Sequence, residues 1–320
     1  MIVVEQIEAL EQECPYVVVA LGTFDGVHLG HQEILGRVVR RARQERGTAA
    51  VFTFARHPLE VIHPSKAPPL ITPLPIKQEI IRSIGIDLLV AITFTPFLAD
   101  TSPGDFVKAY LVDRLRARSV CVGYDFAFGK GRTGSPDTLQ KLGEEHRFSV
   151  EVVPAMTVEG QVVSSTLIRG LLIRGELRAA ARYLGRPYVF QGTVEPGAGR
   201  GKGLGFPTAN LPATADLLVP DGVYVCQVWV RRELRRALVN IGTAPTFGGG
   251  ARRVEVHLVE ASEELYGETL TVFFLGRLRD ERRFESPDLL RQQIESDKRQ
   301  AEEVFTGFPR FSAEEWALLS

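Results

Sequence analysis

Cysteine, methionine and tryptophan are scarce in this chain of 320 residues, and long apolar segments are lacking. The three cysteines, Cys14, Cys121 and Cys226, lie far apart and form no CxxC pair, which argues against a disulfide framework and against structural zinc. No apolar run approaches the roughly 20 residues that span a bilayer. The acidic N-terminus, MIVVEQIEALEQE, has neither the basic nor the apolar region of a signal peptide. We therefore expect a cytoplasmic protein without a membrane partner.

Net charge is nearly absent as well, because 38 Lys and Arg residues offset 39 Asp and Glu residues. Nucleic-acid-binding domains normally carry a basic surplus, so we expect small-molecule substrates and no nucleic acid. We interpret the basic clusters at 40–43 and 231–236 as solvated surfaces of helices and turns. The length fits two domains of roughly 100–200 residues each, and it indicates no oligomeric state.

The first part of the chain, 1–185, predicts an α/β domain with a doubly wound, Rossmann-like parallel sheet. Its apolar runs are continuous, as in strands buried on both faces. These runs cover 17–21, 49–54, 88–94, 120–122 and 150–153. Helical patterns separate them, one over about 29–46 and another beginning at Ser102-Pro103, where a capping residue precedes a proline. Repeated strand–helix units predict helices on both faces of the sheet.

The second part, 186–320, predicts an antiparallel β-barrel that ends in a helix over 288–305. Helical patterns stop near Gly185, and short Val-rich segments separated by glycine or proline follow, which is typical of a barrel or sandwich. The segments cover 189–194, 223–230, 237–241, 254–259 and 270–275.

A glycine-punctuated turn follows the first buried run and reads GTFDGVHLGH over 22–31. A helix N-terminus offers backbone N–H groups and its dipole to anions, and glycines let backbone approach a ligand. His28 and His31 are three apart, so both imidazoles face one side of a helix that begins there, and each can donate to phosphate. We interpret them as a nucleotide-phosphate site. A metal pair, for which HExxH is absent, and a structural pair are the alternatives, and Asp25 could be only a turn former.

Three further segments follow later elements of the same domain: 53–58 (TFARHP), 123–129 (GYDFAFG) and 164–169 (SSTLIR). Ligands of open α/β sheets bind outside the carboxyl ends of the strands, where the first two segments are expected. The third resembles a capped helix start with an arginine one turn later, a combination that can clamp a polyphosphate.

Together these motifs resemble the nucleotidyltransferase superfamily with its HxGH signature, and within it the FMN adenylyltransferase module of bacterial bifunctional FAD synthetases. The resemblance implies that His28 and His31 contact the ATP phosphates and that Asp125 lies near a phosphate of nucleotide or flavin. Ala127 and Arg56 depart from the family, in which arginine and proline are common at these positions. The residues expected to bind nucleotide are Gly22, Phe24, Asp25, Gly26, His28, His31, Asp125, Ser165, Thr166 and Arg169.

A second signal, GAGRGKGLGFPTAN over 197–210, opens the second domain. Alternating glycines suit a loop whose amides wrap phosphates, although a glycine-rich hairpin without a ligand is the alternative. No helix follows it, so the dinucleotide-fold interpretation fails. Thr208 and Asn210 are two apart on an extended chain and point to one side, and their oxygens suit Mg²⁺ beside a phosphate.

With the later runs PDGVY, NIGTAPT, VEVHL and LYGE, this segment resembles the riboflavin kinase domain, whose fold is a six-stranded antiparallel barrel with a C-terminal helix. The resemblance implies that Thr208 and Asn210 hold Mg²⁺ and ATP and that Glu268 is the general base for the terminal ribityl hydroxyl. Glu255 is the rival carboxylate. The expected nucleotide- and flavin-binding residues are Gly201, Lys202, Gly203, Gly205, Pro207, Thr208, Asn210, Tyr224 and Asn240.

The two resemblances predict a bifunctional ATP-dependent transferase of FAD biosynthesis. The second domain would convert riboflavin to FMN, and the first would convert FMN to FAD with release of pyrophosphate, with Glu268, His28 and His31 as the catalytic residues. One alternative is a nucleotidyltransferase with another acceptor, joined to a flavin-sensing module. The other is a non-catalytic flavin- or nucleotide-responsive regulator, which would need no base at Glu268.

Overall fold

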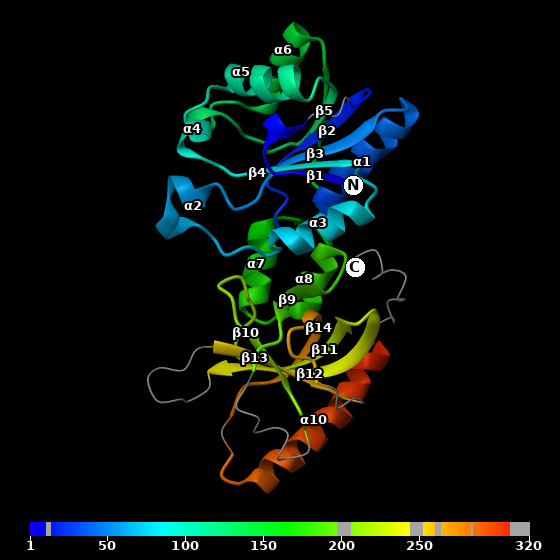
Figure 1. Ribbon diagram of the computed structural model, residues 1–320, viewed down its shortest axis with the longest axis vertical. Helices are drawn as coiled ribbons and strands as arrows, with labels where there is room; N and C mark the ends of the chain where they lie inside the picture. The colour runs from blue at the N-terminus through cyan, green and yellow to red at the C-terminus, as the bar shows by residue number, and fades with distance from the viewer. Residues whose placement is uncertain (11–13, 197–205, 244–251, 260–263, 283, 308–320) are drawn as a thin grey trace. The chain divides into compact units, whose positions relative to one another are not determined.

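The computed structural model describes residues 1–10, 14–196, 206–243, 252–259, 264–282 and 284–307 (Figure 1). The chain divides into two compact units, Met1–Ser165 and Thr166–Ser320. Helices α7 (Ser165–Ile173) and α8 (Leu177–Leu184) therefore fall almost entirely in the second unit. The domain boundary that the sequence predicts after residue 185 lies beyond these helices and stays a prediction.

The first unit is built on a six-stranded, all-parallel sheet with the strand order β1-β4-β3-β2-β5-β6. The strands are β1 (Ile2–Val4), β2 (Val17–Leu21), β3 (Thr48–Phe54), β4 (Leu88–Ile92), β5 (Ala117–Gly123) and β6 (Ser149–Val153). The expected parallel sheet is confirmed, and β1 is an edge strand that the sequence did not predict. After β2 the chain builds outward through β3 and β4, then returns to place β5 on the other side of β2. A switch point of this kind opens a crevice at the carboxyl ends of the strands, where ligands of such sheets bind.

Helices cover both faces of this sheet, with α1 and α3 on one side and α5 and α6 on the other (Figure 1). Each presents an apolar stripe inward: in α1 the buried residues Ile34, Leu35, Val38 and Ala42 recur at helical spacing. Ser102 caps α5 by accepting a hydrogen bond from the amide of Asp105 at 3.1 Å, as its position before a proline predicts. The helices are α1 (Leu29–Gln44), α2 (Leu59–Ile62), α3 (Leu74–Ser83), α4 (Pro96–Ala99), α5 (Pro103–Phe106), which continues as a π-helix over Val107–Arg114, and α6 (Pro136–His146); a small hairpin pairs β7 (Thr157–Val158) with β8 (Gln161–Val162).

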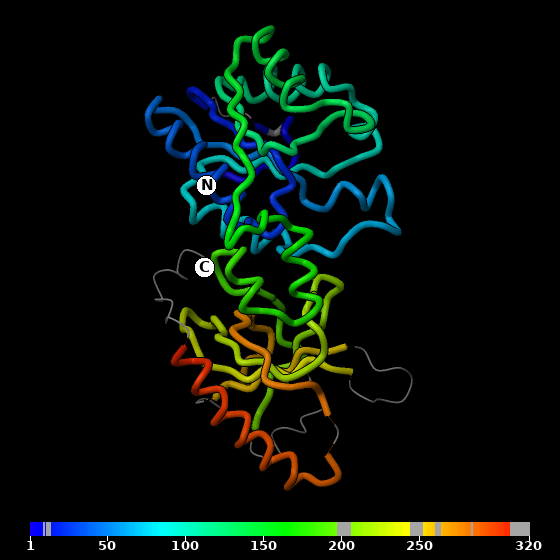
Figure 2. Tube along the Cα trace, turned by 180° about the vertical axis from the view of Figure 1, so that it is seen from behind, coloured from blue at the N-terminus to red at the C-terminus, as the bar shows by residue number. Residues whose placement is uncertain are grey.

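The second unit contains a curled antiparallel sheet of six strands, in the order β10-β13-β12-β11-β14-β9. Its strands are β9 (Tyr188–Thr193), β10 (Ala209–Pro212), β11 (Gly222–Val230), β12 (Glu233–Thr243), β13 (Arg252–Leu258) and β14 (Thr269–Arg279). An isolated antiparallel bridge between Glu195 and Asn210 joins the two ends of this order, which curls the sheet towards a barrel. Helix α10 (Pro287–Gly307) lies beside it in both views, and Ala301 and Phe305 pack on Leu238 (Figures 1 and 2). The expected barrel-like sheet with a terminal helix is confirmed.

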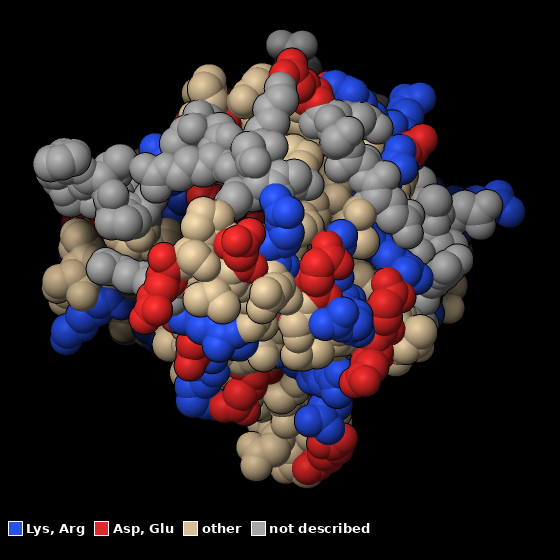
Figure 3. Space-filling model, turned by 90° about the horizontal axis from the view of Figure 1, so that it is seen from below, with Lys and Arg blue, Asp and Glu red and all other residues tan. Residues whose placement is uncertain are grey.

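Charged side chains of both signs are interspersed on the face seen in Figure 3 and do not gather by sign. No helix within the described ranges is long and apolar enough to cross a bilayer. The cytoplasmic location stays a prediction.

Candidate active sites

The turn between β2 and α1 is bent into an unusual backbone path and is buried. Phe24, Gly26 and Val27 all have positive φ, at 47°, 85° and 39°. For side chains other than glycine this conformation is strained, and it persists only where surrounding contacts hold it. The carboxylate of Asp25 supplies such contacts, since its Oδ1 accepts from the amides of Ile71 at 2.9 Å and Thr72 at 3.1 Å. Asp25 therefore fixes the turn by its side chain.

The two histidines of the motif meet as the spacing predicts. His28 is the N-cap of α1, and its Nδ1 accepts from the amide of His31 at 3.3 Å. Their rings stack with centroids 3.6 Å apart, and the Phe24 ring meets the His31 ring edge-on at 5.2 Å. Because Nδ1 of His28 accepts, the proton of its neutral imidazole lies on Nε2. The pair thus forms one imidazole surface at the N-terminus of a helix, a position that favours anions.

Two buried side chains bind the same turn: Thr53, which opens the predicted segment 53–58, and Lys77, which the sequence analysis did not single out. The carbonyl oxygen of Thr23 accepts from Oγ1 of Thr53 at 3.0 Å and from Nζ of Lys77 at 2.9 Å. Thr53 is the next-to-last residue of β3 and is fully buried. Lys77 lies with Ile80 on the buried face of α3. A lysine at a core position of a helical stripe is the signal that points to it in the sequence.

The other predicted residues of the first site lie in three places. Gly22 continues β2, and Asp125 is exposed after β5, so both lie at the carboxyl edge that flanks the switch point. Oγ of Ser165 donates to the carbonyl of Asp25 at 2.8 Å, which joins the start of α7 to the turn. Thr166 and Arg169 follow in α7, and their contact with a triphosphate stays a prediction.

A cluster of aromatic rings, missed in the sequence analysis, lines the same edge of the sheet. Phe54 ends β3, Phe94 follows β4 and Phe126 follows β5. The rings of Phe54 and Phe94 meet edge-on at 5.2 Å, and Phe126 stacks on Phe128 at 5.4 Å. Phe54, Phe94 and Phe126 are only partly buried, so they leave aromatic surface beside the turn. Aromatic residues at or shortly after the ends of three buried runs are the sequence signal.

In the second unit, the segment that follows β9 bonds to two predicted site residues, one on each side of it. The amide of Val194 donates to the carbonyl of Glu268 at 2.9 Å, and the amide of Glu195 donates to the carbonyl of Asn210 at 2.9 Å. Gly267 donates back to Val194 at 3.0 Å and has a φ of 78°, which glycine adopts without strain. Glu268, the expected base, and Asn210, an expected metal ligand, therefore lie on opposite sides of the segment that contains Val194 and Glu195.

Strand register places three polar side chains in one row. Asn210 of β10 lies opposite Glu255 of β13, which lies opposite Asn240 of β12. Directly opposed residues of antiparallel strands share a face, with Cβ atoms about 5 Å apart. Glu255, the rival carboxylate, thus stands between two predicted ligand-binding residues, and it is half-buried.

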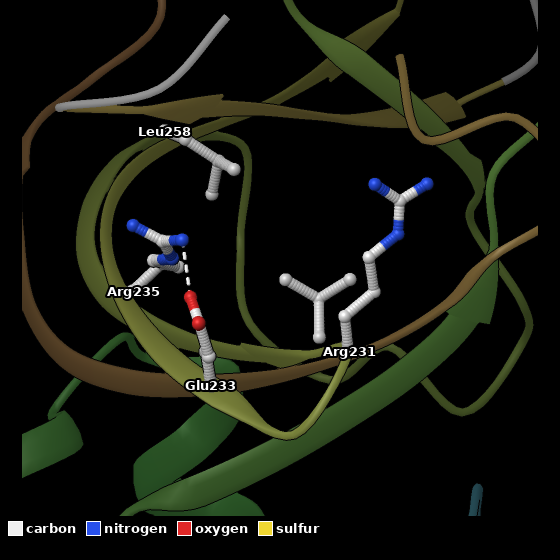
Figure 4. Close-up of a pocket in the computed structure, with 5 residues that line it drawn as sticks. Arg231, Glu233, Arg235 and Leu258 are labelled. Carbon is white, nitrogen blue, oxygen red and sulfur yellow. Dashed lines mark ion pairs between the residues drawn. The ribbon is translucent and has the colours of Figure 1, made fainter. Parts of the chain in front are cut away.

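The side chain of Glu268 is held by a cation. Nε of Arg231 lies 2.9 Å from Oε1 of Glu268, and Nη2 of Arg231 donates to the carbonyl of Glu264 at 3.2 Å. Arg231 also lines a small pocket of 140 Å³ at the β11–β12 turn, together with Val230, Glu233, Arg235 and Leu258. Figure 4 shows Arg231 and Arg235 on opposite sides of this pocket, with Arg235 paired to Glu233.

Two further residues of the second unit hold backbone carbonyls by their side chains. Tyr224 is fully buried, its hydroxyl donates to the carbonyl of Pro220, and burial raises the pKa of Tyr224 to about 12. Nδ1 of His257 lies 3.0 Å from the carbonyl of Pro207, directly before Thr208, so Nδ1 carries the proton. Burial lowers the pKa of His257 and favours this neutral form. Gly201, Lys202, Gly203 and Gly205 lie outside the described residues.

Comparison with known proteins assigns both units to enzymes of flavin metabolism. A family model described as FAD synthetase matches residues 10–167, and one described as riboflavin kinase matches residues 184–305. A bifunctional riboflavin kinase/FMN adenylyltransferase of Bacillus subtilis is 35% identical over 302 residues, covering 93% of this chain and 95% of that protein. The chain belongs to the bifunctional riboflavin kinase/FMN adenylyltransferase family. It is a transferase whose FAD synthetase domain precedes its riboflavin kinase domain.

Other members of the family agree. The relatives of the same name from Escherichia coli K12 and Listeria monocytogenes are 35% and 36% identical, and each alignment covers 90% of this chain and 92% of the relative. A crystal structure from Streptococcus pneumoniae, named a macrolide-efflux protein, matches with a TM-score of 0.83 and 30% identity, over 94% of this chain and 98% of that one. The efflux name belongs to that neighbour; the likeness covers both units of this chain.

Proposed function

We propose that the first unit adenylylates FMN at the turn that carries His28 and His31, and that the second unit phosphorylates riboflavin between Asn210 and Glu268. The observation that carries the first placement is topological, because this turn leaves β2 at the switch point of the parallel sheet. The second placement is supported by Val194 and Glu195, which bind Glu268 and Asn210 on either side.

Adenylylation needs no nucleophile from the protein, because FMN brings its own. A phosphate oxygen of FMN attacks the α-phosphorus of ATP, the bond from that phosphorus to the bridging oxygen of the β-phosphate breaks, and pyrophosphate leaves. His28 and His31 stabilise the charge that develops on the departing phosphates, as preorganised donors do. Nε2 of His28 is the donor, since its Nδ1 is engaged by the amide of His31.

The aromatic cluster offers a place for the flavin. Phe54, Phe94 and Phe126 are partly buried at the same carboxyl edge as the histidine turn. Planar rings stack favourably on such surfaces, and burial of aromatic area contributes strongly to binding. We place the isoalloxazine ring of FMN there.

Riboflavin phosphorylation needs a base, because an alcohol is a poor nucleophile at neutral pH. Glu268 accepts the proton of the terminal ribityl hydroxyl while its oxygen attacks the γ-phosphorus, and ADP leaves. Most of the acceleration comes from alignment and charge neutralisation, as in other phosphoryl transfers. Glu268 directly precedes β14, and its Oε1 is engaged by Arg231, a contact that the substrate hydroxyl can replace.

Thr208 and Asn210 would hold Mg²⁺. The donor set fits, because hydroxyl and amide oxygens are hard ligands and the row that contains Asn210 adds the carboxylate of Glu255 on the same face. When bound, the ion would neutralise charge on the ATP phosphates. His257 orients Pro207, directly before Thr208, by holding its carbonyl.

Flavin product analysis tests both placements. Purified protein is incubated with riboflavin, ATP and Mg²⁺, and the flavins are separated by chromatography over time. We expect FMN before FAD in the wild type, arrest at FMN in His31→Ala, and phosphorylation slowed by about 10²–10⁴ in Glu268→Ala. Supplying FMN directly to Glu268→Ala should restore FAD. Undiminished phosphorylation in Glu268→Ala, or undiminished FAD in His31→Ala, would refute the corresponding placement.

A further inference from the structure

Buried polar groups concentrate around the turn that precedes α1. Of the eight polar or charged residues that are buried in the described ranges, five lie in or against this turn: Asp25, His28, Thr53, Thr72 and Lys77. Lysine is almost never fully buried without a compensating role, yet Lys77 is only 2% exposed. An apolar residue would fill its position on the stripe of α3 without the cost of desolvating a charge.

The ammonium of Lys77 ties together the ends of two neighbouring strands. Its Nζ donates to the carbonyl of Thr23, just beyond β2, at 2.9 Å and to the carbonyl of Phe54, the last residue of β3, at 3.4 Å. Thr53 donates to the same Thr23 oxygen. Both carbonyls stand at the carboxyl edge of the sheet, and the carbonyl of Thr23 directly precedes the strained residue Phe24. Lys77 therefore fixes where the phosphate-binding turn begins.

Lys77 also interacts with the turn electrostatically. Asp25 on the turn is the charged group that faces the ammonium, and the end of β3 presents only Thr53 and carbonyl oxygens. The charged neighbours on α3 itself, Glu79 and Arg82, pair with one another. Burial lowers the pKa of Lys77 to about 8, and the nearby Asp25 offsets only part of that shift. The proton of this buried ammonium can thus be gained or lost near neutral pH.

We propose that Lys77 is a charged positioning residue of the adenylyltransferase site, which fixes the Thr23 carbonyl beneath the turn and binds its proton more tightly when a nucleoside triphosphate occupies the site. The inference rests on the proposed placement of the triphosphate at His28 and His31. Phosphate charge favours the ammonium form across a weakly screened interior. By linkage, the protonated form must then bind the nucleotide more tightly. Nucleotide affinity should fall as the pH rises through the pKa of Lys77.

Steady-state kinetics of FMN adenylylation between pH 7 and pH 9 provide the first test. In the wild type we expect KM for ATP to rise about tenfold over this interval, because one proton is lost above a pKa near 8. In Lys77→Met, KM for ATP should be at least tenfold higher at pH 7 and should lose this pH dependence. Lys77→Arg keeps its charge and should show a flat profile with the lower KM. Lys66→Met, at an exposed position of the same chain segment, is the matched control and should follow the wild type.

Riboflavin phosphorylation by the same preparations is the internal reference, because it takes place in the other unit. It should be unchanged in Lys77→Met at each pH. If KM for ATP in adenylylation has the same pH dependence in the wild type and in Lys77→Met, the proposal is overturned. His31→Ala separates this failure from misplacement of the site: undiminished adenylylation in His31→Ala would refute the placement, whereas impaired His31→Ala with normal Lys77→Met would refute the role of Lys77 alone.

A measurement on the unaltered protein covers the case in which Lys77→Met does not fold. Lysine labelled at Cε and Nζ reports the ammonium pKa by NMR, with the Lys77 signal assigned from its loss in Lys77→Arg. We expect a pKa near 8 without nucleotide and an upward shift of at least one unit with a non-hydrolysable ATP analogue. An ordinary lysine pKa, or one that the analogue leaves unchanged, would overturn the proposal.

Discussion

The two active sites hold their functional side chains in opposite ways. In the first unit, Asp25 is 2% exposed and His28 is 6% exposed. Buried donors, Thr53 of β3 and Lys77 of α3, hold the turn through the carbonyl of Thr23. In the second unit, the side chain of Glu268 is 38% exposed and its partner Arg231 is 48% exposed. One site is supported from the core, whereas the other depends on a contact that solvent can replace.

The difference matches the chemistry of the two reactions. Adenylylation takes its nucleophile from FMN, so the protein contributes fixed donors whose value lies in not reorganising during the reaction. Phosphorylation needs a base that meets a hydroxyl, accepts its proton and later returns it to solvent. A base locked in the core could not exchange partners, so exposure of Glu268 is consistent with its task.

The second unit is exposed at its site but holds a buried ionic contact elsewhere, at Asp297. Its side chain, 2% exposed on α10, accepts from Arg279 of β14 at 2.8 Å and from Gln293 at 2.7 Å, so the second unit also has a buried ionic contact, away from its site. Breaking such a pair leaves an uncompensated charge, and we expect Asp297→Ala to destabilise this unit by about 3–5 kcal/mol. Urea unfolding followed by the fluorescence of Trp229 in β11 measures the effect.

Glu303→Ala, at an exposed position of the same helix, is the control and should change stability by less than about 0.5 kcal/mol. Adenylylation of supplied FMN should survive in Asp297→Ala. If Asp297→Ala lowered the free energy of unfolding no more than Glu303→Ala does, the buried ion pair would not stabilise the second unit. Weak charge contacts would then be a property of the whole unit and not of its site alone.

Asp25 tests whether the first site needs its buried support. Asp25→Ala leaves the buried amides of Ile71 and Thr72 without an acceptor, so we expect the first unit to lose about 3 kcal/mol and adenylylation to fall at least tenfold. Asp25→Asn keeps an acceptor of the same shape and should retain most of the stability. Far-UV circular dichroism in urea and FAD formation from FMN give the two readouts. If alanine proved as good as asparagine, the turn would not depend on this side chain.

Much of this architecture could be predicted from the sequence, because it follows from local pattern. The run 17–21 becomes β2 with the same bounds, and the helix expected over 288–305 is α10 (Pro287–Gly307). The stacked histidines follow from a spacing of three at a helix start. Strand β1 could not be predicted in this way, since three residues carry no periodicity and pair with β4 only in the folded chain.

The supports of the sites depend on tertiary structure, so residue type alone misjudges them. As a lysine, Lys77 would be expected at the surface, although its spacing from Ile80 places it on the apolar stripe of α3. The packing of α3 against the strand ends shows that it is buried. Glu255 could face solvent on an isolated strand, whereas the register sets it between Asn210 and Asn240. Arg231 belongs to a cluster expected to be solvated, yet it contacts Glu268. A sequence motif therefore predicts the residues that contact substrate but not the side chains that hold those residues in place.

Stability against pH gives a smaller test of the first site. Burial lowers the pKa of Lys77 from 10.5 to about 8, so the unfolded chain binds the proton more tightly, and stability of the first unit rises with pH between these values. This shift corresponds to about 3 kcal/mol, and loss of the two Lys77 hydrogen bonds costs about 1–3 kcal/mol in Lys77→Met. We therefore expect the stability of Lys77→Met to lie within about 2 kcal/mol of the wild type at pH 7 and to lack the rise with pH. Urea unfolding by circular dichroism at pH 7 and pH 9 decides, and a wild type whose stability does not increase would contradict the expectation.

The smallest effect is expected at Arg231, where the second site differs most from the first. An ion pair this exposed contributes up to about 1 kcal/mol, so Arg231→Met should change the rate of riboflavin phosphorylation less than about fivefold. The direction should be towards a faster reaction, because the ribityl hydroxyl no longer competes with a guanidinium for Glu268. Arg235→Met, across the same pocket and paired with Glu233, is the matched control and should leave the rate unchanged. A loss above tenfold in Arg231→Met alone would show that Arg231 works with the base during transfer. The second site would then hold its charges as firmly as the first, and exposure would no longer distinguish them.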